Sequence, residues 1–307
     1  MLDSATVAAA DHAARHWVHA APGRIGPGDD EYMRMFSRML LDTFNPYKPA
    51  VIDWPQLDPE ARERLISLPI WDIAVQTEGR ARLRILSYAR TVEAQPLRQA
   101  LEHMGFEEGR HKEVLSHLVA AYGIVLEPEP EYVAPKDPEW AWMVTGYSEC
   151  IDSFFAFGLF ELARRSGFFP EALVETFEPV IQEEGRHILF FINWVAWYKH
   201  TMPLWRRPWF FLKTLAVWVF LIRERIGLAR DVGGADGAGK SKQDANFTMK
   251  GSQAVAGEID PAVLMDICLA EDSRRLSGYD PRLRRPTTMP RLTRLARLFI
   301  RPKRARA

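Results

Sequence analysis

The pentapeptide Glu-Glu-Gly-Arg-His occurs twice in this chain. Each copy holds a glutamate and a histidine three residues apart, Glu108 with His111 in the first and Glu184 with His187 in the second. Residues three apart lie on one face of a helix, so each copy can direct a carboxylate and an imidazole at one point. Mixed carboxylate and imidazole ligands suit iron or manganese. The repeat therefore predicts a metal site built from two helices.

Four long helices are predicted around these motifs. They cover about residues 69–94, 96–123, 141–165 and 170–199. The second and third are separated by residues 124–140, whose four prolines argue against a helix there. We therefore expect two helix hairpins joined by a long crossover.

The turn positions select the carboxylates that complete the site. In an antiparallel helix hairpin, two residues face each other when the turn lies midway between them in the sequence. Glu78 faces Glu108 if the turn lies near residue 93, close to the break at Pro96. Glu149 faces Glu184 if the turn lies at Ser166-Gly167, where the helical pattern stops.

Two other acids on the third helix fit this geometry less well. Glu161 would require a turn beyond Pro170, inside the next helix, and is rejected. Asp152 would require a turn near residue 168 and is kept as a substitute for Glu149.

The predicted ligand set carries charges that two divalent metals would balance. It consists of Glu78, Glu108, His111, Glu149, Glu184 and His187. Four carboxylates and two divalent ions give a nearly neutral buried assembly, which matters because an unpaired buried charge costs several kcal/mol. Without metal, these carboxylates are expected to raise one another's pKa.

The doubled motif resembles the ferritin-like di-iron carboxylate superfamily, and its acidic-Glu-x-Arg-His form resembles the oxygen-activating members. The resemblance covers about residues 67–200 and does not identify a subfamily. It implies an all-α, ferritin-like four-helix bundle. It also implies that the acid before each ligand glutamate orients a ligand histidine of the other motif, and that the arginine holds that acid. These residues are Glu107, Arg110, Glu183 and Arg186.

The resemblance implies a di-iron oxygenase or oxidase that activates dioxygen to oxidise a small or apolar organic substrate. The expected cofactors are two iron ions, with manganese or a mixed manganese–iron pair as alternatives, and the electron donor is unspecified. Rival functions are a ferroxidase or iron-handling protein, and a membrane-surface quinone or lipid hydroxylase. A peroxide-scavenging protein of the rubrerythrin kind is disfavoured because the chain has no Cys-x-x-Cys pair.

The chain divides into four predicted parts. They are an N-terminal helical extension (1–66), the di-metal bundle (67–202), an apolar fifth helix (203–230), and a final part with a linker, a short helix and a basic tail (231–307). The basic end could contact anionic lipid or an acidic partner, or could be a solvated tail.

The fifth helix contains the most apolar stretch. Residues 209–222 are interrupted only by Lys213 and are shorter than the roughly 20 residues that span a bilayer. Arginines flank this stretch at Arg206, Arg207 and Arg223. Three interpretations stay open: burial on the bundle, a homodimer interface, and peripheral membrane contact through 204–228.

Two residue types near the motifs have two interpretations each. Gly79, Gly109 and Gly185 serve either close helix packing or space beside the metals for dioxygen or substrate. Aromatic side chains crowd the second hairpin and form either core or the wall of an apolar substrate pocket. They are Phe154, Phe155, Phe157, Phe160, Trp194 and Trp197.

Bulk composition fits a globular protein in a reducing compartment. The 307 residues are 47% hydrophobic and 26% charged, with zero formal net charge. Nothing in that balance points to nucleic acid. Two cysteines, Cys150 and Cys268, are too few for a disulfide framework. No secretory signal is predicted at the N-terminus, so we expect a cytoplasmic location, with membrane association left open.

Overall fold

The computed structural model describes residues 4–49, 52–68, 70–233 and 260–300. Within them the regular structure is helical, and one isolated bridge joins Trp17 to Tyr279. The predicted all-α class is confirmed. Most of the predicted linker, from residue 234 to 259, and the last seven residues of the basic tail lie outside the described residues.

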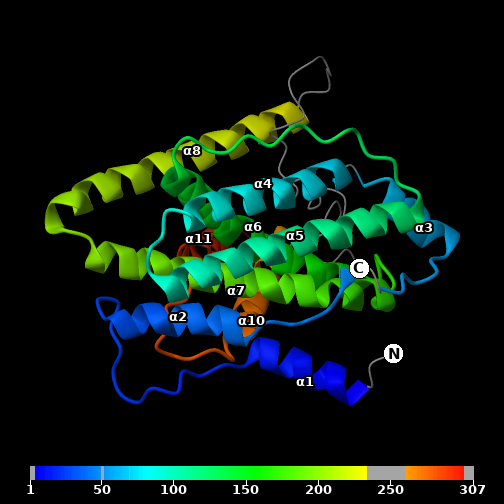
Figure 1. Cartoon of the computed structure of the whole chain (residues 1–307). Helices are drawn as coiled ribbons and strands as arrows, with labels where there is room; N and C mark the ends of the chain where they lie inside the picture. Colours follow the sequence, from blue (N-terminus) through cyan, green and yellow to red (C-terminus); the bar gives the residue numbers. More distant parts are fainter. Residues whose placement is uncertain (1–3, 50–51, 69, 234–259, 301–307) are drawn as a thin grey trace.

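Figure 1 shows the helices in chain order. They are α1 (Ser4–Arg15), α2 (Asp30–Asp42), α3 (Pro59–Ile66), α4 (Trp71–Ala89), α5 (Gln95–Tyr122), α6 (Pro138–Ser166), α7 (Glu171–Thr201), the short η2 (Leu204–Arg206), α8 (Arg207–Gly233), α10 (Pro261–Leu276) and α11 (Thr288–Arg297). The predicted N-terminal extension contains α1, α2 and α3, and part of the basic end is helical.

Helices α4 to α7 form the part of the molecule that holds the motifs. Helix α4 packs against α5 and α6 against α7, while α4 also contacts α6 and α5 contacts α7. The chain turns at residues 90–94 between α4 and α5, and at 167–170 between α6 and α7. The first turn includes residue 93, as the symmetry argument requires, whereas the second begins at the expected Gly167 and extends to residue 170, beyond the position required for Glu149.

Local sequence signals explain where these helices begin and end. Asp137 caps α6 by accepting a hydrogen bond from the Trp140 N–H at 2.9 Å, and Pro138 occupies the first turn. The helix thus starts three residues before the predicted residue 141, because this proline begins a helix and does not interrupt one. Gly123 and Gly167 end α5 and α6 with φ of 70° and 65°.

The crossover between α5 and α6 runs back along α4 and α5 (Figure 1). Lys112 on α5 forms an ion pair with Glu129 of the crossover at 2.6 Å. The Glu127 N–H donates to Asp72 at the start of α4 at 2.7 Å. These contacts fix the segment over the outer side of the first hairpin.

Helices α2 and α10 cover the remaining sides of α4 to α7. Helix α2 packs on α5 and α7, and α10 packs on α6 and α7. The approach of α10 is close at Gly158, where a Cβ atom would lie 2.2 Å from Cys268 Sγ. Glycine is therefore required there by packing.

Among the described residues, helix α8 packs with one side against the rest of the chain and leaves the other side exposed. It packs on α6, and Phe210, Val217 and Leu221 are buried. Trp209 and Phe211 on its other side are 69% and 64% exposed. A search of the described residues found no helix with the length and apolar character needed to cross a membrane.

Candidate metal centre

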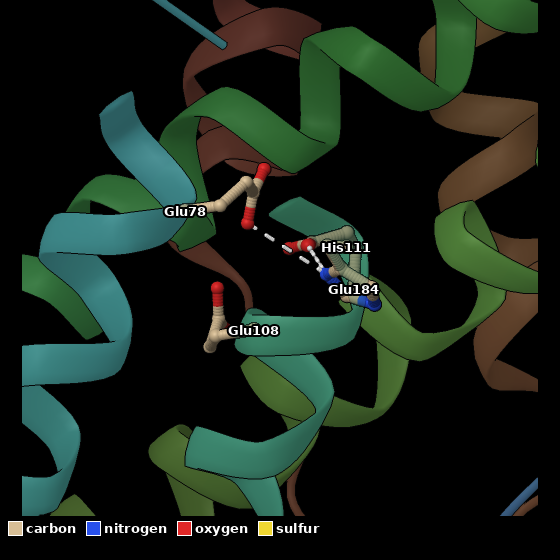
Figure 2. A group of neighbouring side chains, drawn as sticks. All are labelled: Glu78, Glu108, His111 and Glu184. Atoms are coloured by element: carbon tan, nitrogen blue, oxygen red, sulfur yellow. Dashed lines mark ion pairs between the residues drawn. The ribbon is translucent and has the colours of Figure 1, made fainter. Parts of the chain in front are cut away.

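The six predicted ligand side chains come together from four helices. Figure 2 shows Glu78 on α4, Glu108 and His111 on α5, and Glu184 on α7 directed into a common space. One ligand atom from each of these four residues lies within 4.8 Å of the others. A second group, from Glu108, Glu149 and His187, meets the same distance limit. Glu108 belongs to both groups, so its carboxylate could contribute to holding an ion in either one.

Asp152, the alternative to Glu149, lies elsewhere. Its carboxylate accepts a hydrogen bond from the Arg225 guanidinium of α8 at 2.7 Å. Glu161 also lies outside the cluster, paired with Arg164 at 2.7 Å. The turn argument therefore selected the acid that the fold directs inward.

Each histidine of the cluster is oriented by the other motif. His111 Nε2 lies 2.8 Å from Glu183 Oε2, and His187 Nε2 lies 2.9 Å from Glu107 Oε2. A carboxylate can only accept, so each Nε2 carries a proton, and Nδ1 is the ring nitrogen that can bind a metal once it is unprotonated. Those Nδ1 atoms face the inner carboxylates, His111 at 3.2 Å from Glu184 and His187 at 3.0 Å from Glu108. Fixing the tautomer in this way prepares Nδ1 to bind a metal.

Each arginine of the two motifs also contacts a glutamate of the other motif, on the other helix. Arg186 Nη2 donates to Glu107 Oε1 at 3.0 Å, and Arg110 Nη2 donates to Glu183 Oε1. All four side chains are buried. Glu107, Glu183, Arg110 and Arg186 therefore form a self-neutral ring behind the histidines.

The segment from residue 40 to 47 completes this ring and was not anticipated from the sequence. Arg186 donates to the Leu40 carbonyl at 2.9 Å and to Thr43 Oγ1 at 2.7 Å. The Tyr47 hydroxyl donates to Glu183 at 3.2 Å, and the Arg110 guanidinium lies 3.9 Å from the centre of the Tyr47 ring. No short motif marks these residues, because most of the contacts use backbone atoms or depend on how α2 packs.

The inner carboxylates show the electrostatic cost of being gathered together. Burial, and then the charges of Glu78 and Glu184, raise the pKa of Glu108 well above its ordinary value. Burial and the charge of Glu108 do the same to the pKa of Glu149. Glu184 differs, since burial would raise its pKa but the attraction of His111 and His187 and the hydrogen bond from Ser153 lower it. Two inner acids are thus poorly stabilised as anions by the protein alone.

Glu107, in the outer ring formed by Glu107, Arg110, Glu183 and Arg186, behaves in the opposite way. Burial would raise the pKa of Glu107, but the Arg186 charge and hydrogen bonds from His103 and His187 hold it well below its ordinary value. Glu107 therefore stays ionised and can act as a permanent acceptor for His187.

The donor set fits a pair of metal ions on structural grounds. Among the buried atoms with no hydrogen-bond partner in the described part of the chain are the two inward Nδ1 atoms, Glu108 Oε1 and both oxygens of Glu149. Buried polar atoms are normally satisfied, so this cluster requires an explanation. A cation supplies one, because every one of these atoms is a lone-pair donor directed into the cluster.

The cluster opens onto a cavity of about 360 Å³. Glu78, Glu108, His111, Glu149 and Glu184 contribute to its wall. Much of the remaining lining is aliphatic or aromatic. The site therefore combines metal-ligating atoms with space for an organic molecule.

The glycines of the motifs face other parts of the chain. A Cβ at Gly79 would lie 2.7 Å from the Tyr132 hydroxyl of the crossover, and one at Gly109 would lie 3.2 Å from the Arg82 side chain. Gly185 is directed toward Leu276 of α10 at 3.7 Å. These glycines are not part of the cavity wall. The structure therefore favours the packing interpretation for all three.

The aromatic residues of the second hairpin divide between the two interpretations. Phe160 lines the cavity. Phe154, Phe157 and Trp194 are buried in the core, with relative exposures of 1%, 0% and 0%. Trp197 is partly buried and packs against the core.

Searches against models of protein families, curated proteins and solved structures found no significant match for this chain.

Proposed function

We propose that this chain is a ferritin-like di-iron protein that uses dioxygen to oxidise a small or apolar organic substrate. The observation that carries the proposal is that the metal-ligating atoms open onto a largely apolar cavity of about 360 Å³. Storage or oxidation of iron alone does not call for such walls, whereas an organic substrate does.

The helix connectivity supports the ferritin-like assignment. Two hairpins, α4 with α5 and α6 with α7, are joined by the crossover of residues 124–137. Ferritin-like di-iron proteins use one glutamate from each of two helices and a Glu-x-x-His pair from each of the other two. Glu78 and Glu149 fill the first role here, and the two pentapeptides fill the second.

The residues of the chain have distinct tasks in this proposal. The four inner glutamates and the two Nδ1 atoms would hold two iron ions, which would supply the electrons for reducing dioxygen. Glu107 and Glu183 keep the protons on the histidine Nε2 atoms, at 2.9 and 2.8 Å. The apolar walls exclude bulk water and so strengthen the electrostatic interactions inside the cavity.

Metal content is the first test. The full chain, purified after growth with iron and manganese together, is expected to bind two metal ions per chain by elemental analysis. Glu108→Ala should reduce this number, because Glu108 belongs to both ligand groups. The matched control is Glu102→Ala, an exposed residue of the same helix, which should retain both ions. Well under two ions in the parent, unchanged in Glu108→Ala, would refute the proposal.

Reaction with dioxygen separates an oxygenase from a ferroxidase. Ferrous protein mixed with dioxygen should give a transient absorption band that decays faster when an organic substrate occupies the cavity. Slow, substrate-independent oxidation to ferric ion would instead support iron handling. Assembly into a hollow shell in size-exclusion chromatography would also favour that alternative.

A second candidate, a membrane-surface hydroxylase, is favoured by the exposed apolar side of α8. Trp205 and Trp209 are 71% and 69% exposed beside Arg206 and Arg207. Apolar and aromatic residues bordered by arginines suit an interface with anionic lipid. Flotation with anionic and zwitterionic liposomes tests this. Trp209→Ser with Phe211→Ser should abolish binding to the anionic liposomes and leaves the buried side of α8 intact, whereas absence of binding by the parent chain would exclude the candidate.

A further inference from the structure

The cavity beside the metal centre extends along α4 and has two chemically different ends. Trp71, Glu78 and Arg84 all contribute to its wall. Glu78 lies seven residues after Trp71 and six before Arg84, which corresponds to about 10 Å and 9 Å along the helix. The metal centre therefore lies between the two ends of the cavity.

The end near Trp71 is apolar. It is closed by the end of α3, the start of α4, the end of α6 and the first half of α7. The lining residues there include Leu68, Trp71, Phe160, Phe169, Leu173 and Phe177. A polar group placed at this end would lose its hydrogen bonds to water without finding a partner, so the end suits a hydrocarbon chain.

The end near Arg84 is charged. Arg80, Arg84, Asp152 and Glu224 line it, and Arg225 donates to Asp152 at 2.7 Å. The guanidinium groups of Arg80 and Arg84 thus both reach this end of the cavity.

Arg84 differs from Arg80 and Arg225, whose guanidinium groups donate hydrogen bonds. No hydrogen bond or ion pair within the described part of the chain involves its side chain, although its charge is attracted by Glu224. Burial, and then repulsion from Arg80, lower its pKa. A partly buried guanidinium without a close partner is costly, and a bound carboxylate would relieve that cost. The planar guanidinium matches a carboxylate with two parallel hydrogen bonds.

We propose that the substrate is an amphipathic monocarboxylic acid, whose carboxylate binds Arg84 and whose hydrocarbon chain passes the metal centre into the apolar end. The oxidised position then lies several carbon atoms from the carboxylate, because about 9 Å of helix separates Arg84 from Glu78. The oxidation rests on the proposed function, whereas the binding of the acid does not.

Binding of decanoate and of 1-decanol to the full chain tests this inference. Titration calorimetry is done with metal-free protein and with ferrous protein in the absence of dioxygen, below the concentration at which the acid forms micelles. Arg84→Gln is expected to weaken decanoate binding about ten- to hundred-fold, the range of a charge-assisted hydrogen bond, and to leave decanol binding unchanged. The matched control is Arg90→Gln, an exposed arginine at the end of the same helix, which should change neither affinity.

Further variants test the direction of the acid. Ala156→Leu adds volume to the cavity wall on α6 and should weaken tetradecanoate more than decanoate. Equal decanoate affinity in the parent and Arg84→Gln would overturn the inference and would point to direct binding of the acid at the metals. Equal weakening of acid and alcohol would also overturn it. Selective acid binding without oxidation by the ferrous protein would sustain this inference and refute the proposed function.

Discussion

Glu107 and Glu108 are neighbours in α5, both are buried, and their pKa values shift in opposite directions. Glu107 interacts with Arg186 and His187 of α7, at 3.0 and 2.9 Å. Glu108 faces other carboxylates, and burial together with Glu78 and Glu184 raises its pKa. Consecutive residues of a helix are rotated by about 100° about its axis. Glu107 therefore lies in the neutral ring, whereas Glu108 lies among carboxylates whose negative charge the protein does not neutralise.

The difference shows how one short motif provides two functions. The outer ring of Glu107, Arg110, Glu183 and Arg186 is satisfied by the protein and gives a fixed frame for the histidines. The inner cluster gathers negative charge that the protein does not neutralise. Such an arrangement favours metal binding over stability of the metal-free chain.

Removing the cation from the outer ring should have the largest effect on stability. Arg186→Met leaves Glu107 buried without its main positive partner and should lower the free energy of unfolding of the metal-free chain by about 3–5 kcal/mol. Denaturant unfolding measures this. Adding Glu107→Gln should recover part of the loss, since the unpaired charge is then gone. A loss below about 1 kcal/mol in the single variant would mean that the ring is not the frame we describe.

Removing a carboxylate from the inner cluster should instead affect the metal. Glu149→Gln is expected to weaken binding of one metal ion more than about 100-fold, beyond the range found for residues that only support ligands. The metal-free chain should lose little stability, because both Glu149 oxygens already lack partners. Competitive titration with a chelator gives the affinities, and Asp152→Asn, outside the cluster, is the control. Equal metal affinities for the two variants would contradict the assignment of Glu149.

Asp272 on α10 is a buried carboxylate outside both the outer ring and the inner cluster. It therefore tests how much stability the burial of such a group costs. Burial raises its pKa to about 6, although Arg294 lowers it somewhat. The folded state therefore favours the protonated acid, so this contribution to stability is present below about pH 4 and is lost as the pH rises through about 6. Asp272→Asn should stabilise the chain by about 1–3 kcal/mol at pH 8 and by much less at pH 4.

Glu271, the residue before Asp272, provides the control for that prediction. Glu271 is paired with Arg274 at 2.7 Å, so Glu271→Gln should not stabilise the chain at pH 8. Urea unfolding of both variants at the two pH values makes the comparison. A gain at pH 8 in both, or in neither, would show that pairing does not govern the cost of these buried acids.

The smallest expected effect is at the edge of the outer ring. Tyr47→Phe removes one hydrogen bond to Glu183, at 3.2 Å, and should cost about 1 kcal/mol of stability. Arg110 still contacts Glu183, so both metal ions should be retained in elemental analysis. Loss of a metal ion in this variant would show that His111 depends on Tyr47 for its orientation.

The positions of the site residues along the chain could be predicted because helices obey simple geometry. Spacing of three residues put Glu108 with His111 on one face, and symmetry about the turns selected Glu78 and Glu149 over Asp152 and Glu161. Prolines and terminal glycines marked most helix ends to within a few residues. These signals are local, so they are available before any packing is known.

The contacts between distant segments were decided only in three dimensions. Nothing local to residues 40–47 indicates that they satisfy Arg186 and Glu183, since those bonds depend on how α2 packs against α5 and α7. The same holds for Arg84, whose lack of a partner depends on where α6 and α8 place their charges.

The sequence by itself therefore determined the types of the candidate metal ligands, their order and the helices that carry them. Tertiary structure decided that Arg110 meets Glu183 and Arg186 meets Glu107 between the two helices, because these pairs depend on the packing of α5 against α7. It also decided that the cavity has an apolar end and a charged end. Periodicity is a property of one helix, whereas charge compensation and cavities are properties of several helices together.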